Sequence, residues 1–139
     1  MSVARVDKEL PLPKYETPQA AAFDFITRED TRVAAGSVGL VPSNLVVKVP
    51  RGYALLVVPR SSTPRKKGLS IPHGIGIIDN DYCGPDDEIK IQVYNFSGKD
   101  VVVRRSERIA QGVLVKTARA DFKEGLKNYQ SRGGFGSTG

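Results

Sequence analysis

The sequence predicts an all-β domain, arranged as a distorted jelly roll or β-barrel with at most one short helix. Short apolar, β-branched segments recur between turn signals rich in Pro, Gly and Asn, which is typical of strands joined by tight loops. One segment, residues 88–94, alternates polar and apolar side chains with a period of two, as a strand with one buried face requires. No comparable window places apolar residues at helical spacing, so we favour a barrel or jelly roll over alternating strands and helices.

Strands are predicted where β-branched and aromatic residues gather between turn residues. In chain order, the predicted strands cover residues 20–26, 45–49, 53–58, 75–78, 89–96, 101–103 and 109–115. Residues 41–44 and 96–99 contain Pro or Gly beside Ser or Asn, and these segments are predicted as loops between strands.

A single short helix is predicted after Ser61. Ser62 or Thr63 can cap its first turn, and Pro64 fits the first turn because a proline there removes no helical hydrogen bond. Gly68 is suited to end the helix. We therefore expect one or two helical turns.

Length and composition indicate one compact domain. With 139 residues and 40% hydrophobic content, the chain can bury a core without disulfides or a structural metal. We expect a β domain over residues 1–126 and a flexible, Gly-rich C-terminal arm over residues 127–139. The single cysteine, Cys83, excludes an intramolecular disulfide and fits a reducing, cytoplasmic setting. No apolar run approaches the roughly 20 residues of a membrane helix, so neither secretion nor membrane insertion is expected.

The charge of the chain favours polyanionic partners. A formal net charge of +6 and a pI near 9.6 suit nucleic acid, a membrane surface or a small phosphorylated ligand. The basic run at residues 65–67 is most simply a solvated face, because no interleaved aromatic residues make it a nucleic-acid platform. Charge alone leaves the choice among these partners open.

Asp79 is the first candidate for chemistry. It directly follows an apolar run that looks buried, where a carboxylate is costly unless it is paired or used. A carboxylate held there could orient and deprotonate a water, as general-base hydrolysis requires. The alternative is a plain polar hairpin, since Asn80, Asp81 and Gly84 are turn residues.

Asp24 and residues 59–63 are candidates for binding magnesium and phosphate. Strand alternation places Asp24 opposite Phe23 and Phe25, where its carboxylate could reach a Mg²⁺ ion held mainly by substrate phosphates. A solvent-facing strand position is the alternative. Residues 59–63 offer a cation, hydroxyls and backbone amides that suit a phosphate, although ordinary helix capping explains the hydroxyls equally well.

Taken in order, several segments resemble the five motifs of the trimeric dUTPase family, and the match spans nearly the whole chain. They are residues 12–15 with 21–25, then 59–62, 76–84, 107–111 and 134–139. One such motif is weak evidence, whereas five in this order are specific. The resemblance implies the family's β-clip jelly roll, a homotrimer with shared active sites, Mg²⁺ as cofactor, and hydrolysis of dUTP to dUMP and pyrophosphate. Such an enzyme supplies dUMP for thymidylate synthesis and keeps uracil out of DNA.

The resemblance also implies roles for individual residues. Asp79 activates the water that attacks the α-phosphorus, and Asp24 reaches Mg²⁺ through water. The hairpin takes uracil mainly through backbone groups, with Tyr82 packed against the deoxyribose where a 2′-hydroxyl would clash. The C-terminal arm closes over the occupied site, with Phe135 on uracil and Arg132 at the γ-phosphate. The implied substrate-binding residues are Arg60, Ser61, Ser62, His73, Gly76, Ile77, Ile78, Asp79, Tyr82, Lys90, Gln111, Arg132, Phe135 and Gly136.

Three departures from the family pattern bear on these roles. The spacing between Arg132 and the Gly-Phe-Gly segment is shorter than in many members, which leaves Lys127 as an alternative phosphate contact. Ser62 stands where the family usually has glycine, and residues 85–87 lengthen the hairpin.

Two other classes of function are weighed against hydrolysis. A dCTP deaminase shares the fold and an Arg-Ser-Ser element, but it needs a glutamate where this chain has Gln92, three residues before Asn95. A glutamine cannot perform that proton transfer. A basic β-barrel that binds nucleic acid or protein without catalysis is the second alternative, and it would show salt-dependent nucleic-acid binding without nucleotide turnover.

Overall fold

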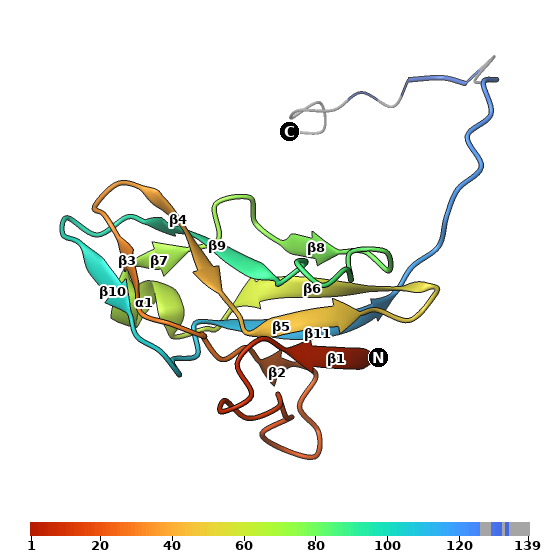
Figure 1. Ribbon diagram of the computed structural model, residues 1–139. Helices are drawn as coiled ribbons and strands as arrows, with labels where there is room; N and C mark the ends of the chain where they lie inside the picture. Colours follow the sequence, from red (N-terminus) through yellow and green to blue (C-terminus); the bar gives the residue numbers. More distant parts are fainter. Residues whose placement is uncertain (126–128, 132, 134–139) are drawn as a thin grey trace.

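A computed structural model of the protein shows a barrel-like, nearly all-β fold and describes residues 1–125, 129–131 and 133 (Figure 1). The elements in chain order are β1 (Ser2–Arg5), β2 (Phe23–Asp24), β3 (Thr31–Val33), β4 (Val38–Pro42), β5 (Leu45–Lys48), β6 (Tyr53–Pro59), α1 (Thr63–Lys67), β7 (Leu69–Ser70), β8 (Gly76–Ile78), β9 (Lys90–Asn95), β10 (Val101–Val103) and β11 (Ala110–Lys116). No helix within the described residues is long and apolar enough to cross a membrane.

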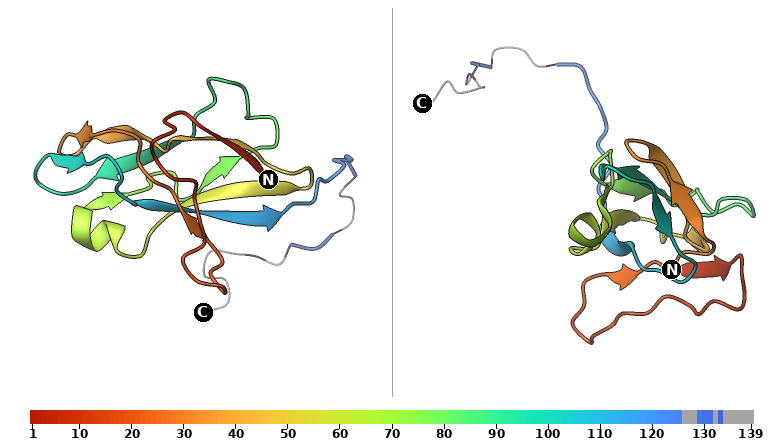
Figure 2. Two further views of the ribbon diagram at one scale, coloured as in Figure 1. Left: turned by 60° about the horizontal axis from the view of Figure 1, so that its bottom comes forward. Right: turned by 90° about the vertical axis from the view of Figure 1, so that its left-hand side faces the viewer.

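Two sheets form the body of the fold. The larger has the strand order β2-β11-β6-β8 and the smaller β4-β9-β7, while β1 pairs with β5 and β3 with β10. The end-on view in Figure 2 shows the strands enclosing a common interior. β6 and β11 pair along their whole length, from Pro59 opposite Ala110 to Tyr53 opposite Lys116. This antiparallel ladder joins the two ends of the sheet at which the candidate site residues lie.

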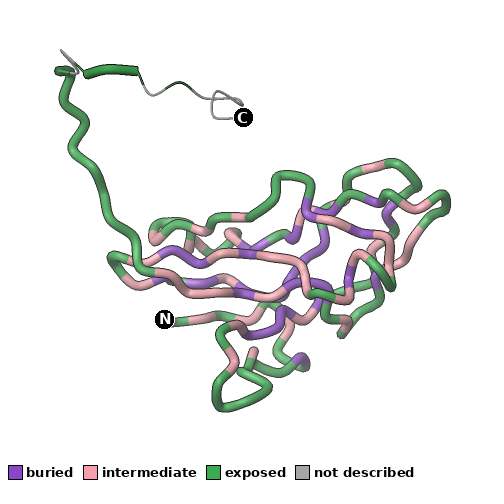
Figure 3. The backbone as a smooth tube through the Cα atoms, turned by 180° about the vertical axis from the view of Figure 1, so that it is seen from behind, coloured by how far each residue is buried: buried purple, intermediate pink, exposed green. Residues whose placement is uncertain are grey.

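Apolar side chains from both sheets fill one core. Figure 3 marks the buried residues along the backbone in purple. The predicted alternation along β9 is confirmed, because Ile89, Ile91 and Val93 are buried whereas Lys90 is exposed. Each fully buried side chain of this kind stabilises the fold by about 1.5–3 kcal/mol. Glu88 departs from the alternation, since it is charged and nevertheless buried.

The predicted helix is confirmed as α1. Gly68 ends it with a φ of 65°, a left-handed conformation that favours glycine, and its N–H donates to the Pro64 carbonyl oxygen. Ser62 occupies the N-cap position, but its side chain makes no capping hydrogen bond. The Thr63 hydroxyl instead donates to the Ile109 carbonyl oxygen at 2.7 Å, which ties α1 to the start of β11. The Ser62 hydroxyl is therefore not used to cap the helix.

The predicted loop at residues 41–44 is wrong in its first half. β4 continues through Pro42, which lies opposite Lys90 at the end of the ladder, where a missing N–H is tolerated. The turn follows at Asn44, which has a φ of 66° and whose side-chain Nδ2 donates to the Asp7 carbonyl oxygen at 3.0 Å. The sequence does not predict β1, β3, β4 or β7 as strands. β1 and β3 each contain an arginine, β4 contains Gly39 and Pro42, and β7 has only two residues, so none shows a continuous apolar segment.

Candidate active site

One group of candidate residues surrounds Asp24, where β2, β6 and β11 meet. Asp24 lies opposite Gln111 in the β2–β11 pair, and Gln111 lies opposite Val58 in the β6–β11 pair. This register brings Asp24 beside Arg60, which directly follows β6. Sheet pairing therefore brings together residues of the first, second and fourth motif-like segments.

Asp24 is buried and paired with two arginines. It is only 9% exposed, on the strand face opposite the buried Phe23 and Phe25. Its Oδ1 lies 2.9 Å from Arg60 Nε, and its Oδ2 lies 3.3 Å from Arg108 Nη1. The alternative of a solvent-facing position is therefore wrong. A buried carboxylate is costly to leave unpaired, so Asp24 holds both guanidinium groups at one point.

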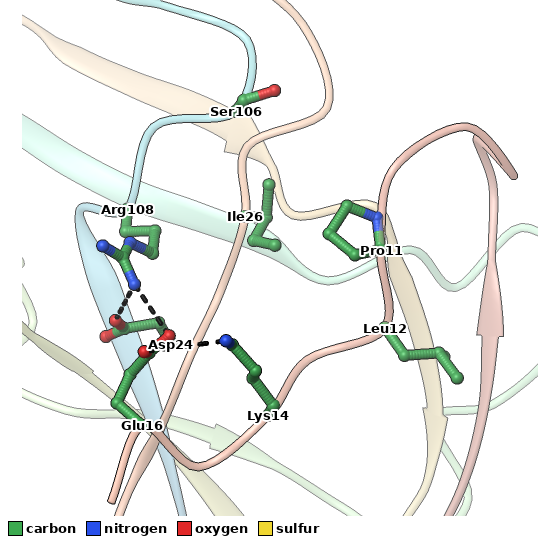
Figure 4. Close-up of a pocket in the computed structure, with 8 residues that line it drawn as sticks. All are labelled: Pro11, Leu12, Lys14, Glu16, Asp24, Ile26, Ser106 and Arg108. Atoms are coloured by element: carbon green, nitrogen blue, oxygen red, sulfur yellow. Dashed lines mark hydrogen bonds and ion pairs between the residues drawn. The ribbon is translucent and has the colours of Figure 1, made fainter.

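Arg108 is a site residue that the sequence analysis missed. Besides Asp24, Arg108 contacts Glu16, with 2.8 Å between Arg108 Nη1 and Glu16 Oε1. Glu16 in turn pairs with Lys14, with 3.9 Å between Glu16 Oε2 and Lys14 Nζ. Figure 4 shows these alternating charges beside a cavity of about 440 Å³. A signal was present in the sequence, because Arg108 precedes Gln111 within the fourth motif-like segment.

We call this group the anion cradle; its residues are Asp24, Arg60, Ser61, Ser62, Arg108 and Gln111. Gln111 Nε2 donates to the Pro59 carbonyl oxygen at 3.2 Å, so this amide is oriented toward the end of β6. Ser61 is exposed and Ser62 is half-buried. Guanidinium, hydroxyl and amide groups together form a donor set that suits phosphate oxygens.

The second group of candidate residues lies on the hairpin that follows β8. Asp79 is the first residue after this strand, which forms an edge of the larger sheet. Asp79 and Asp81 are exposed, and both line a cavity of about 760 Å³. Asn80 donates from Nδ2 to the Val49 carbonyl oxygen, which attaches the hairpin to the barrel. The hairpin thus presents carboxylates to an open space.

The apolar run before Asp79 is only partly buried, contrary to the expectation from sequence, because Ile78 alone packs against the core. Ile75 is 49% exposed and Ile77 is 63% exposed, because β8 is the last strand of its sheet. Asp79 itself is exposed, so the argument that burial makes this carboxylate costly does not apply within one chain. Exposed apolar side chains beside a cavity instead indicate a surface that a ligand or another subunit covers.

Gly76, His73 and Tyr82 lie around this hairpin. A Cβ at Gly76 would meet Val57 Cβ at 3.2 Å and His73 Nε2 at 3.5 Å, so glycine lets β8 approach its neighbours closely. Tyr82 is 40% exposed, and its hydroxyl donates a long hydrogen bond, 3.5 Å, to the Glu88 carbonyl oxygen. Its ring is therefore accessible on one side.

Glu88 anchors the end of the hairpin in the barrel. Its Oε1 accepts hydrogen bonds from Arg28 Nε at 3.0 Å and from the Asn44 N–H at 2.9 Å, and its Oε2 lies 2.6 Å from Lys90 Nζ. Burial raises the pKa of Glu88, but hydrogen bonds from Arg28, Lys90 and Asn44 outweigh it and hold the pKa below its ordinary value. Lys90, predicted to bind substrate, here neutralises this buried carboxylate.

The predicted arm residues Arg132, Phe135 and Gly136, with the alternative Lys127, lie outside the described residues. Their roles stay predictions.

The anion cradle and the hairpin lie far apart within one chain. Leu55 of β6 lies opposite Ile78, so Asp79 follows at the level of Ala54. Arg60 stands six residues from Ala54 along the chain, and at about 3.3 Å per residue the two ends are separated by roughly 20 Å. A single phosphate group cannot contact both.

Two features define the class of protein. Cationic donors surround a buried carboxylate on a jelly-roll frame, and a second carboxylate lies on a distant hairpin. The chain is therefore an all-β protein suited to a phosphorylated ligand. Comparison with known families then identifies the particular family, because residues 8–139 match the family model described as dUTPase. The chain belongs to the dUTPase family, as its motifs predicted.

Similar proteins support this assignment over nearly the whole chain. The deoxyuridine 5'-triphosphate nucleotidohydrolase of Lactococcus lactis is 38% identical over 131 residues, covering 92% of this chain and 87% of that protein. The Streptococcus mutans dUTPase structure has a TM-score of 0.81 at 35% identity, and the match covers 88% of this chain and 100% of that chain. A mutant dUTPase from phage phi11 of S. aureus, whose structure shows coordination of a structural Mg(II) ion, shares the fold with a TM-score of 0.80 at 18% identity, over 91% of this chain and 97% of that one. The predicted jelly-roll fold is confirmed.

Proposed function

We propose that this chain hydrolyses dUTP to dUMP and pyrophosphate. The observation that carries the proposal is the anion cradle, in which Asp24 holds Arg60 and Arg108 toward one point in a member of the dUTPase family. The sequence relatives are named nucleotidohydrolases, which supports hydrolysis over a deaminase or a non-catalytic module. Gln92, on β9, offers no carboxylate for the proton transfer of a deaminase.

Asp79 acts as the general base. Its carboxylate takes a proton from a water whose oxygen forms a bond to the α-phosphorus, while the bond from that phosphorus to the leaving pyrophosphate breaks. The backbone of residues 76–78 recognises uracil, and His73 lines the same pocket. The exposed ring of Tyr82 packs on the deoxyribose and leaves no room for a 2′-hydroxyl.

The anion cradle holds the phosphate chain. Arg60, Ser61, Ser62 and Gln111 donate hydrogen bonds to phosphate oxygens, and charge-assisted bonds of this kind are the stronger ones. By fixing the α-phosphorus relative to the attacking water, they contribute through positioning rather than through bond-making.

Each active site is shared between subunits of a homotrimer. The separation of roughly 20 Å between the cradle and Asp79 supports this, because the extended strand between them cannot shorten. The cradle of one subunit therefore faces the hairpin of a neighbour. Exposed apolar side chains offer surface for such an assembly to bury: Ile77 on β8, Ile75 just before it, and Val38 and Leu40 on β4.

Asp24 fits a role toward Mg²⁺. No group of three His, Cys, Asp or Glu side chains that could hold a metal gathers among the residues that the structure describes. One carboxylate reaching through water to an ion chelated by a triphosphate matches the coordination that Mg²⁺ prefers. The ion would neutralise charge on the leaving pyrophosphate.

The arm completes the site in this proposal. Phe135 stacks on uracil with Gly136 beside it, and Arg132 contacts the γ-phosphate, which excludes water from the reacting groups. Lys90 lies near the ligand at the end of the hairpin. The lone cysteine, Cys83, supports the cytoplasm as the setting.

The test is pyrophosphate release from dUTP, UTP, dTTP and dCTP in the presence of Mg²⁺, with ammonia release from dCTP measured in parallel. We expect rapid turnover of dUTP alone and no ammonia. Ammonia release would favour the deaminase, and salt-dependent nucleic-acid binding without turnover of any nucleotide would favour the binding module.

A further inference from the structure

We propose that Lys66 is a further substrate-binding residue, which holds the terminal phosphates of the triphosphate in a cavity beside the anion cradle. The inference rests on the proposed function for the identity of the substrate. It is carried by the lining of that cavity and by the pairing of the charges around it.

The cavity lies between α1 and the chain that leads into β11. Its volume is about 300 Å³, and it opens beside the cradle rather than beside the hairpin. The residues that give it its chemistry are Arg60, Ser62, Lys66, Lys67, Glu107 and Arg108. Four of these six carry positive charge and one carries negative charge, so the lining favours an anion.

Lys66 supplies the positive charge of this cavity that is not already neutralised. Arg60 pairs with Asp24, and Arg108 pairs with both Asp24 and Glu16, so two carboxylates balance these two arginines. Lys67 Nζ lies 2.6 Å from Glu107 Oε1, so that pair is also balanced. In the described part of the chain, no carboxylate lies within ion-pair distance of Lys66. An arriving polyanion therefore meets Lys66 without first displacing a protein carboxylate.

The position of Lys66 assigns it to the far end of the phosphate chain. Its backbone N–H donates to the Ser62 carbonyl oxygen at 2.9 Å, so Lys66 stands one helical turn beyond the cradle serines. A phosphate held by Arg60 and Ser62 leaves the next phosphates to extend into the cavity. dUMP lacks those phosphates, so Lys66 favours the triphosphate substrate over the monophosphate product.

Arg65 provides a matched control. It is exposed, carries the same charge and neighbours Lys66 on α1, but it does not line the cavity.

The experiment is calorimetry on the full chain with α,β-imido-dUTP and dUMP as probes. It compares the wild type with the Lys66→Ala, Lys66→Arg and Arg65→Ala variants. Loss of a charge-assisted contact predicts about tenfold weaker binding of α,β-imido-dUTP by Lys66→Ala, with dUMP affinity unchanged. Lys66→Arg should restore most of the affinity, and Arg65→Ala should stay within about twofold of wild type.

The proposal is overturned if Lys66→Ala and Arg65→Ala weaken the triphosphate analogue equally, or if dUMP affinity falls in parallel. Binding of inorganic tripolyphosphate to the same variants separates this test from that of the proposed function. The chain could turn over no dUTP and yet bind tripolyphosphate more weakly in Lys66→Ala alone. That result would support the phosphate site at Lys66 and refute only dUTP as the substrate. No difference between the variants for either polyanion refutes the site.

Discussion

The two halves of the candidate site differ in how the fold holds them. In the anion cradle, Asp24 is 9% exposed and is fixed between Arg60 and Arg108 where three strands meet. On the hairpin, Asp79 is exposed and follows an edge strand in which Ile77 is 63% exposed. The cradle is thus complete within one chain, whereas the hairpin presents an uncovered surface. A site that uses both is expected to form where two copies meet.

The largest effect is expected from substitutions that inactivate one half of the site at a time. Asp79→Asn removes the proposed base, and loss of general-base catalysis lowers kcat by about 10²–10⁴-fold. Arg60→Ala removes a cradle cation and should also leave little activity. The measurement is steady-state pyrophosphate release from dUTP, with Asp81→Asn as the control for a nearby exposed carboxylate.

Mixed trimers then decide whether the halves come from different subunits. In trimers reassembled from equal amounts of the Asp79→Asn and Arg60→Ala chains, about one site in four pairs an intact hairpin with an intact cradle, because each interface in a ring joins two different surfaces. Activity should therefore recover to about a quarter of wild type. A mixture as inactive as its two parents would place both halves of the site in one chain.

The anchor of the hairpin is expected to show the next largest effect. Glu88→Gln leaves Arg28 without its buried partner and should lower the free energy of unfolding by about 2–3 kcal/mol, somewhat less than for a fully buried pair because Arg28 is partly exposed. Urea denaturation measures the change. Glu29→Gln is the matched control, because Glu29 pairs with the same arginine but is exposed, and it should cost less than about 1 kcal/mol. Equal losses in the two variants would contradict the anchoring role.

The same ion pair predicts a dependence on pH. The pKa of Glu88 in the fold lies below its ordinary value of 4.5, so its stabilising effect is present in full above that pH and is lost as the pH falls through the folded-state pKa. The difference in unfolding free energy between wild type and Glu88→Gln should therefore shrink below about pH 4.5. A difference that stays constant into that acid range would mean that the carboxylate charge is not responsible.

A smaller effect is expected at the sugar pocket of the hairpin. Tyr82→Ala should lower the ratio of kcat/KM for dUTP over UTP by about tenfold or more, since the ring no longer collides with the 2′-hydroxyl. Tyr82→Phe keeps the ring and should keep the ratio. An unchanged ratio in Tyr82→Ala would assign sugar selection to another group.

The smallest effect is expected at the outer end of the cradle. Glu16 is 45% exposed at its side chain and holds Arg108 from the N-terminal segment. Exposed ion pairs of this kind contribute about 0–1 kcal/mol, so Glu16→Gln should change KM for dUTP by no more than about threefold. A tenfold change would make Glu16 part of the cradle itself.

The sequence was sufficient for much of the fold because its strongest signals are local. The alternation along β9 determines which face of the strand is buried. Ser62, Thr63 and Pro64 mark the start of α1 and Gly68 marks its end, and both predictions are confirmed. β4 was not predicted, because Pro42 is a turn signal in sequence but stands at the end of a ladder in space.

The sequence by itself determined the order of the motif-like segments and hence the family, the fold class and most of the candidate residues. Only the tertiary structure decided that Asp24 is buried between Arg60 and Arg108, and that Ile77, two residues before Asp79, is exposed. The physical reason is that burial and ion pairing depend on which strands are neighbours. Neighbouring strands are set by long-range pairing and by the position of β8 at the edge of its sheet, which residues nearby in sequence do not specify.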